Sequence, residues 1–132
     1  MKKLLLFTMF ICCSMAMWAQ DKKPAEIKFD ESVHHFGEFS EKDAKQSCTF
    51  TFTNVGEEAL VINQAVASCG CTIPKYPKEP IQPGEKGTIE VLYNGKGKSL
   101  GFFKKTITVR TNGAVELTRL VIDGTMTAAT TE

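Results

Sequence analysis

The sequence predicts an all-β protein, an antiparallel β-sandwich of about seven strands that follows an N-terminal signal peptide. Two observations support this fold class. Apolar and polar residues alternate with a period of two, and Gly, Pro and Asn turn signals separate the alternating segments. No segment after residue 19 has the period of an amphipathic helix, and the short connections favour antiparallel pairing.

The clearest strand is expected at residues 48–53. Its sequence, Cys-Thr-Phe-Thr-Phe-Thr, places cysteine and phenylalanine on one face and threonine on the other, as in a half-buried strand. Residues 60–66 form the next expected strand, with Leu60, Ile62 and Val66 as its apolar positions. The remaining strands are expected at residues 26–29, 33–36, 88–93, 102–110 and 119–125.

The first nineteen residues have the order of a secretory signal peptide: a basic start at Lys2 and Lys3, an apolar stretch, and small residues up to Ala19. The apolar stretch is shorter than the ~20 residues that a membrane-spanning helix needs. We therefore expect cleavage after Ala19 and a periplasmic or extracellular location. An uncleaved anchor is disfavoured by the short span, and a lipid anchor at Cys12 or Cys13 by the bulky residues before them.

The expected domain organisation is a signal peptide at residues 1–19, a flexible lead-in at 20–26, one sandwich at 27–125 and a flexible tail at 126–132. Without the signal peptide the chain keeps fourteen basic residues against fifteen acidic ones, a net charge of −1. This balance lacks the basic surface that nucleic-acid binding requires. We expect no nucleic-acid partner, and no transmembrane segment once the signal peptide is cleaved.

The most informative residues are Cys69-Gly70-Cys71, which lie between the expected strand at 60–66 and the prolines that follow. In a flat strand the two cysteines would be about 6.6 Å apart along the chain, whereas the Cβ atoms of a disulfide lie about 3.8 Å apart. A bond between them therefore requires the chain to bend at Gly70, which can adopt a positive φ. The small ring that results would be strained and easily reduced.

Other roles for Cys69 and Cys71 are open at this stage. Two close thiolates suit a soft ion such as Cu(I), so both cysteines are candidate metal ligands. A structural zinc site needs four ligands, and His34 and His35 face opposite ways in a strand, so they are poor additions to the pair. A structural role, in which the cysteines pack a crossover loop at residues 68–80 onto the sandwich rim, is equally supported.

Cys48 could form an inter-sheet disulfide with Cys69 or Cys71, but it is expected instead to be a small buried hydrophobe. It alternates in phase with Phe50 and Phe52, and the three cysteines after residue 19 are an odd number, so at least one lies outside an intrachain disulfide. The sequence places no Cys/His/Asn set together and contains no phosphate-binding glycine loop. We therefore expect no enzymatic activity and no cofactor.

Several motifs resemble, in their order, those of a known family. They are Phe-Gly at residues 36–37, Thr-Phe-Thr-Asn-Val-Gly at 51–56, Ser-Cys-Gly-Cys-Thr at 68–72, Ile-Gln-Pro-Gly-Glu-Lys-Gly at 81–87, Gly-Phe-Phe-Lys-Lys at 101–105 and Val-Arg-Thr-Asn at 109–112. From about residue 27 to residue 125 the chain resembles the bacterial secreted domain-of-unknown-function family fifteen-seventy-three, which is similar to the immunoglobulin-like sandwiches of the ASH/Hydin and MSP type. The resemblance implies an immunoglobulin-like fold and an extracytoplasmic setting, and it implies no activity.

Together these features predict an exported, non-enzymatic immunoglobulin-like binding or scaffold module whose partner is an envelope or extracellular protein. Exposed sheet edges are the places where such a module would accept a partner strand. The alternative is a copper-binding or thiol-redox protein that acts through Cys69 and Cys71.

Overall fold

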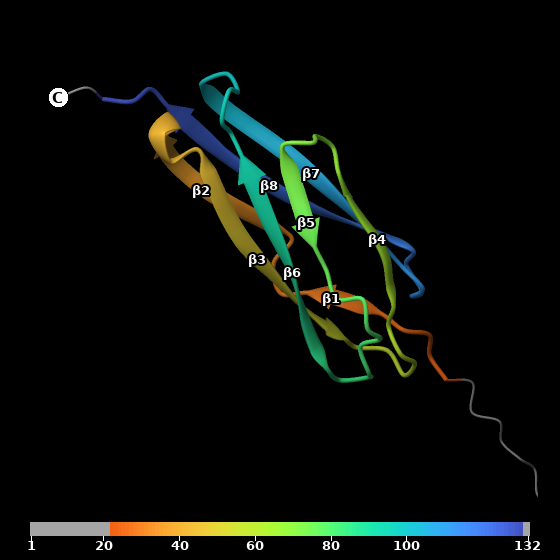
Figure 1. The fold of residues 1–132 in the computed structure, drawn as a ribbon. Helices are drawn as coiled ribbons and strands as arrows, with labels where there is room; N and C mark the ends of the chain where they lie inside the picture. The colour runs from red at the N-terminus through yellow and green to blue at the C-terminus, as the bar shows by residue number, and fades with distance from the viewer. Residues whose placement is uncertain (1–21, 131–132) are drawn as a thin grey trace, which may run out of the picture.

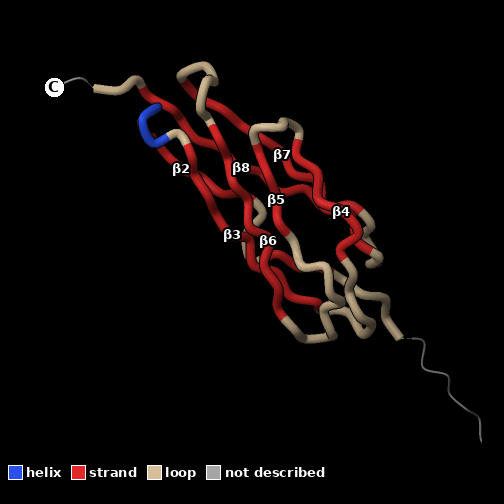
Figure 2. The backbone as a smooth tube through the Cα atoms, in the orientation of Figure 1, coloured by secondary structure: helices blue, strands red, loops and turns tan. Residues whose placement is uncertain are grey.

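A computed structural model describes residues 22–130, which form two four-stranded sheets packed face to face (Figure 1). The β3–β6 sheet has the order β1-β3-β6-β5, with β1 at Ile27–Phe29, β3 at Lys45–Asn54, β6 at Lys86–Asn94 and β5 at Thr72–Lys75. The β7–β8 sheet has the order β2-β8-β7-β4, with β2 at Val33–Ser40, β8 at Leu117–Thr127, β7 at Gly101–Thr111 and β4 at Ile62–Ala67. One turn of 3-10 helix, η1 at Glu41–Asp43, joins β2 to β3 (Figure 2). The predicted all-β sandwich is confirmed.

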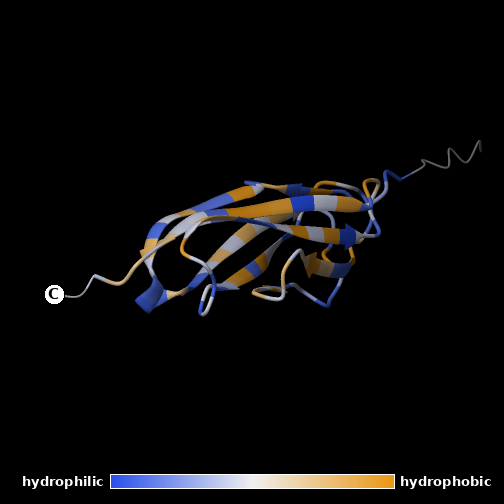
Figure 3. Ribbon diagram, turned by 90° about the horizontal axis from the view of Figure 1, so that it is seen from above, coloured by the Kyte–Doolittle hydropathy of each residue, from blue (hydrophilic) through white to orange (hydrophobic). Residues whose placement is uncertain are grey.

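The alternation of apolar and polar residues builds the core between the two sheets, and Figure 3 shows it as alternating colours along the strands. In β3, Cys48, Phe50 and Phe52 are buried, and the threonines between them are more exposed. Burial of a phenylalanine such as Phe52 contributes about 1.5–3 kcal/mol. Inward positions on the other strands are also buried: Leu60, Ile62, Ile89, Val91, Tyr93, Ile107, Val109, Leu120 and Ile122.

Three details differ from the sequence prediction. β5 is an eighth strand inside the expected crossover loop, and it escapes prediction because it is four residues long and contains Pro74. β2 pairs in parallel with β8, since these two strands are distant in sequence and no short connection forces them to be antiparallel. Val66 is 48% exposed rather than inward, because a bulge between Ile62 and Gln64 shifts the alternation by one residue.

The buried side chain of Asn54 holds one end of the sandwich together. Its Oδ1 accepts hydrogen bonds from Glu26 N at 3.3 Å and from Gly56 N at 3.0 Å. Its Nδ2 donates to Glu58 O at 2.7 Å and to Ile81 O at 2.9 Å. One side chain therefore uses its full bonding capacity to join three separate segments of the chain.

The sandwich extends slightly beyond its predicted limits. Ala25, in the expected flexible lead-in, is 1% exposed, and a Cβ added to Gly56 would lie only 2.7 Å from Ala25 Cα. At the other terminus, β8 continues to Thr127 and buries Met126. The expected signal peptide at residues 1–19 lies outside the described residues. Between residues 22 and 130, no helix has the length and apolar character needed to cross a membrane.

Candidate functional site

The Cys-Gly-Cys segment lies in a turn, residues 68–72, that leads from β4 of one sheet to β5 of the other. Thr72 N donates to Cys69 O at 3.1 Å, which is the i to i+3 hydrogen bond of a β-turn. Two further main-chain bonds fasten the turn to both sheets, from Ser68 N to Thr106 O on β7 at 2.9 Å and from Asn94 N on β6 to Cys71 O at 2.8 Å. The turn is therefore fixed in position relative to both layers.

Cys69 and Cys71 form a disulfide across this turn, with their Cα atoms 5.2 Å apart. The chain bends at Gly70 as such a bond requires, but Gly70 does not use the positive φ that we expected. Cys71 is buried, whereas Cys69 is half-buried, so an attacking thiolate reaches the sulfur of Cys69 more easily. In this oxidised state neither sulfur is a thiolate, and metal binding by the pair would first require reduction.

Cys48 is the free cysteine of residues 22–130, and it is buried in the core as predicted. Burial raises the pKa of the Cys48 thiol to about 11. Because the thiolate is the form that attacks disulfides and binds metals, the raised pKa and the burial of Cys48 both disfavour its reaction at neutral pH. It therefore does not belong to the candidate site.

His34 and His35 do not approach the cysteines, because β2, which carries them, and β4 lie at opposite edges of the β7–β8 sheet. The two imidazoles face opposite ways, as predicted. The ring of His34 packs against Phe36 with centroids 4.8 Å apart, while His35 Nδ1 lies 2.7 Å from Asp123 Oδ1 at the surface. Across residues 22–130, no three His, Cys, Asp or Glu side chains converge as a metal site.

A second candidate site is the free edge of β4, the last strand of its sheet. In an antiparallel ladder, every second residue turns its main-chain N–H and C=O away from the neighbouring strand. Since Ser68 N bonds to Thr106 O, this alternation leaves the main-chain groups of Ala65 and Ala67 pointing away from β7. The chain has no charged residue from 59 to 74. The β4 edge thus lacks the lysine or proline that commonly prevents pairing with another strand.

The other three sheet edges are less open than that of β4. β1 has only three residues, and β5 carries Pro74 and Lys75. β2 is bent by a register shift around Gly37, whose φ is +71°. Short length, proline, lysine and bulges are the features by which natural sheets protect an edge. β4 is therefore the edge best suited to accept a further strand.

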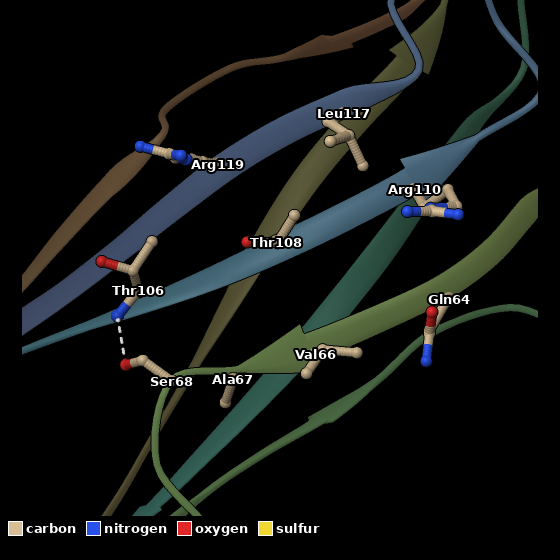
Figure 4. A pocket seen from close by; sticks show the side chains of 9 residues that line it. All are labelled: Gln64, Val66, Ala67, Ser68, Thr106, Thr108, Arg110, Leu117 and Arg119. Atoms are coloured by element: carbon tan, nitrogen blue, oxygen red, sulfur yellow. Dashed lines mark hydrogen bonds between the residues drawn. The ribbon is translucent and has the colours of Figure 1, made fainter.

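Beside this edge, the outer face of the β7–β8 sheet carries a shallow groove of about 520 Å³ (Figure 4). Val66 and Leu117 form its apolar part, and each is 48% exposed. Arg110 on β7 and Arg119 on β8 also line it. Arg110 Nε lies 3.7 Å from Glu116 Oε1, a pair too exposed to be strong. Within residues 22–130 Arg119 has no acidic partner at ion-pair distance, so the groove offers cations to a ligand.

Residues 27–126 match the family described as protein of unknown function (DUF1573). The chain belongs to this family. No curated protein matches the sequence of this DUF1573 chain.

Solved structures share the immunoglobulin-like fold of the DUF1573 domain. A protein of unknown function from Porphyromonas gingivalis is 13% identical with a TM-score of 0.66, over 78% of this chain and 47% of that one. The ASH/PapD-like domain 7 of human CEP192 is 7% identical with a TM-score of 0.64, over 81% of this chain and 89% of that one. The periplasmic chaperone SfaE is 8% identical with a TM-score of 0.61, over 80% of this chain and 61% of that one. The DUF1573 chain thus spans about half of the P. gingivalis protein, and these low identities show the fold alone.

Sequence reasoning identifies the Cys-Gly-Cys turn but not the β4 edge or its groove. The available signal is the run without charge at residues 59–74, the region that contains β4. Whether such a run is a covered strand or an open edge depends on the strand order, which the sequence of one segment does not contain.

Proposed function

We propose that the DUF1573 domain is an exported, non-enzymatic binding module that takes an extended segment of an envelope or extracellular protein along the free edge of β4. The observation that carries this proposal is an edge strand without charge or proline beside a cationic groove. The main chain of an added strand would bond to Ala65 and Ala67, which supplies affinity without sequence preference. Acidic side chains that reach Arg110 or Arg119 would add specificity.

Export is supported by the charge–apolar–small order of residues 1–19 and by the fold likeness to a periplasmic chaperone. In cells that express the full chain, the envelope fraction should contain a product whose N-terminal residue is Gln20. N-terminal sequencing of the fractionated protein measures this directly. A product that keeps residues 1–19, or that stays in the cytoplasm, contradicts the proposal of export with cleavage.

Photo-crosslinking tests the docking surface. A photoreactive amino acid in place of Asn63, on β4, should capture an envelope protein, whereas one in place of Glu90, on the exposed face of β6, should not. Ala65→Pro is the diagnostic variant, because the N–H of residue 65 faces away from β7 and its loss spares the existing ladder. The captured protein should disappear in this variant while the fold is kept.

Val66→Pro is the matched control, because it tests whether the N–H of residue 66, unlike that of residue 65, points toward β7. Val66 is paired with Thr108, and the alternation turns its N–H toward β7, so proline there should remove a bond of the fold and lower stability. Ala65→Pro should be clearly more stable than Val66→Pro in denaturant unfolding. Capture at residue 63 that survives Ala65→Pro in a folded protein would argue against strand addition.

The disulfide between Cys69 and Cys71 supports a second candidate function, thiol–disulfide exchange with a partner dithiol. One partner thiolate would attack Cys69 Sγ and break the bond between the two sulfurs, and the departing Cys71 thiolate would take up a proton. The second partner thiolate would then displace Cys69 from the mixed disulfide, and Cys69 would be protonated in turn. The partner is thereby oxidised to a disulfide, and the two cysteines are reduced.

Intact mass after alkylation under denaturing conditions tests this second candidate. In the product that begins at Gln20, Cys48 alone should be alkylated before reduction, because Cys69 and Cys71 are bonded. Mild reduction should make both available, since so small a ring is expected to open easily. For the copper version, the reduced protein should bind Cu(I) more tightly than Cys69→Ser/Cys71→Ser. Equal uptake by both proteins would remove a metal role for the pair.

A further inference from the structure

The loop between β6 and β7 forms a distinct exposed tip. Figure 1 shows this loop at the end of the sandwich opposite the start of the described chain. The neighbouring residues Phe102 and Phe103 point to opposite faces of β7. Phe103 stacks on Tyr93 with ring centroids 4.0 Å apart, whereas Phe102 is 69% exposed and Leu100 is 50% exposed. The core does not use these two apolar side chains, which leaves them available for contacts outside the domain.

The same tip is cationic. The sequence has no acidic residue between Glu90 and Glu116, and this stretch contains Lys96, Lys98, Lys104, Lys105 and Arg110. Lys98, Lys104 and Lys105 line a surface hollow of about 410 Å³ together with Leu100 and Phe102. Lys104 shares the face of β7 that carries Phe102, whereas Lys105 lies on the face of Phe103, so the hollow offers a negatively charged group ammonium groups from both faces of the strand.

The acidic residues of neighbouring elements do not form ion pairs with Lys98, Lys104 or Lys105 in residues 22–130. Glu41 and Asp43 of η1 lie around a separate hollow, together with Lys96. Asp123 is the cross-strand neighbour of Lys104, but its Oδ1 lies 2.7 Å from His35 Nδ1. Within residues 22–130, no acidic side chain comes within ion-pair distance of Lys98, Lys104 or Lys105.

The loop has a defined shape at its base. Gly95 N donates to Ala44 O at 2.9 Å, which ties the loop to the start of β3. Lys98 N donates to Gly95 O at 3.0 Å, and Lys96 N donates to Asn94 Oδ1 at 3.0 Å. These bonds turn the chain back before Leu100, so the tip is presented on a fixed support rather than on a long free loop.

We propose that the tip formed by Lys98, Leu100, Phe102, Lys104 and Lys105 docks the domain on an anionic lipid bilayer. Leu100 and Phe102 would enter the boundary between headgroups and acyl chains, and the lysines would contact lipid phosphates. Two apolar side chains provide far less than the ~800 Å² per partner of a stable protein–protein interface. Reversible binding to a membrane surface instead gains from each apolar side chain that is inserted and from the attraction of lysines to anionic lipids.

Vesicle sedimentation tests the proposal with the protein purified from cells that express the full chain. Vesicles of phosphatidylglycerol and phosphatidylethanolamine should bind the protein, and vesicles of phosphatidylcholine should bind it weakly. Phe102→Ser should reduce the affinity by about tenfold to a hundredfold. Lys98→Gln and Lys104→Gln should reduce it by roughly fivefold each, and added salt should weaken binding in the same way.

Matched substitutions separate the tip from the rest of the surface. Leu117→Ser removes an apolar side chain that is 48% exposed at the other end of β7 and β8, and Lys86→Gln removes a lysine at the start of β6. Neither should change binding to vesicles. All variants are compared as the product that begins at Gln20, so that the apolar residues 4–19 do not contribute to vesicle binding. Because Phe102 is exposed, its replacement should leave the circular dichroism spectrum and melting temperature unchanged.

An environment-sensitive dye provides a second readout. A dye on Phe102→Cys should shift to the blue with anionic vesicles, and a dye on Leu117→Cys should not. Selective labelling is possible in the product that begins at Gln20, which lacks Cys12 and Cys13, because Cys48 is buried and Cys69 is bonded to Cys71. Equal binding of Phe102→Ser and Leu117→Ser would overturn the proposal. A Phe102-dependent dimer without vesicles, or crosslinking of residue 102 to a protein instead of lipid, would overturn it too.

Discussion

Replacement of Asn54 by alanine should destabilise the sandwich by about 4–6 kcal/mol. The side chain is 0% exposed and makes four hydrogen bonds to main-chain groups. Three of these bonds contribute about 1 kcal/mol each, and Gly56 N would be left buried without an acceptor at a cost of about 1–3 kcal/mol. Ile81 O would keep its bond from Leu60 N at 2.8 Å. The sum is a large part of the roughly 5–15 kcal/mol that stabilises a domain.

Denaturant unfolding followed by circular dichroism, with the disulfide intact, measures this loss. Asn112→Ala is the matched control, because Asn112 Oδ1 accepts from Val61 N at 2.8 Å and its Nδ2 donates to Ala59 O at 3.1 Å. Asn112 is exposed, so water can replace both bonds and the expected loss is about 1 kcal/mol or less. Equal losses in the two variants would refute the reasoning that burial makes the Asn54 network strong.

The remaining predictions concern the pH dependence of stability and the close contact between Gly56 and Ala25. Burial raises the pKa of Cys48 from 9.0 to about 11 and also raises the pKa of Tyr93, so the folded state holds these protons more tightly than the unfolded state. The associated stability, roughly 2–3 kcal/mol for Cys48, is complete below pH 9 and is lost as the pH rises toward 11. Cys48→Ala should flatten this decline in unfolding measured against pH, and an unchanged slope would speak against the burial effect. Gly56→Ala should lower the melting temperature, because the added Cβ would lie 2.7 Å from Ala25 Cα. Gly70→Ala should have little effect, because a Cβ at Gly70 meets nothing within 4 Å. Similar melting temperatures for the two variants would contradict this account.

The core strands can be predicted because the alternation of apolar and polar residues within each strand indicates which of its faces is buried. In β3 the alternation of phenylalanine and threonine identifies the buried face without knowledge of any other strand. β5 has too few residues for such a pattern, and its pairing with β6 decides its structure. The outward position of Val66 depends on a bulge opposite β7, so the sequence of β4 alone assigns Val66 to the wrong face.

The candidate sites divide in the same way. The sequence locates the Cys-Gly-Cys turn and predicts the burial of Cys48, because spacing and alternation are local features. It leaves a disulfide, a metal site and structural packing as alternatives, because these depend on how closely the turn brings Cys69 to Cys71. The β4 edge and the groove beside Arg110 depend on the order of strands in the sheet, which is a long-range property.

Hydrogen exchange at the amides of β4 tests the central claim most directly. In the free protein, Ala65 and Ala67 should exchange rapidly, because their N–H groups point away from β7, while Val66 should be protected by its ladder bond. Addition of a peptide from the protein captured at residue 63 should slow exchange at Ala65 and Ala67 and leave Val66 unchanged. Protection of Ala65 and Ala67 in the free protein, or unchanged exchange with the peptide bound, would contradict strand addition at β4.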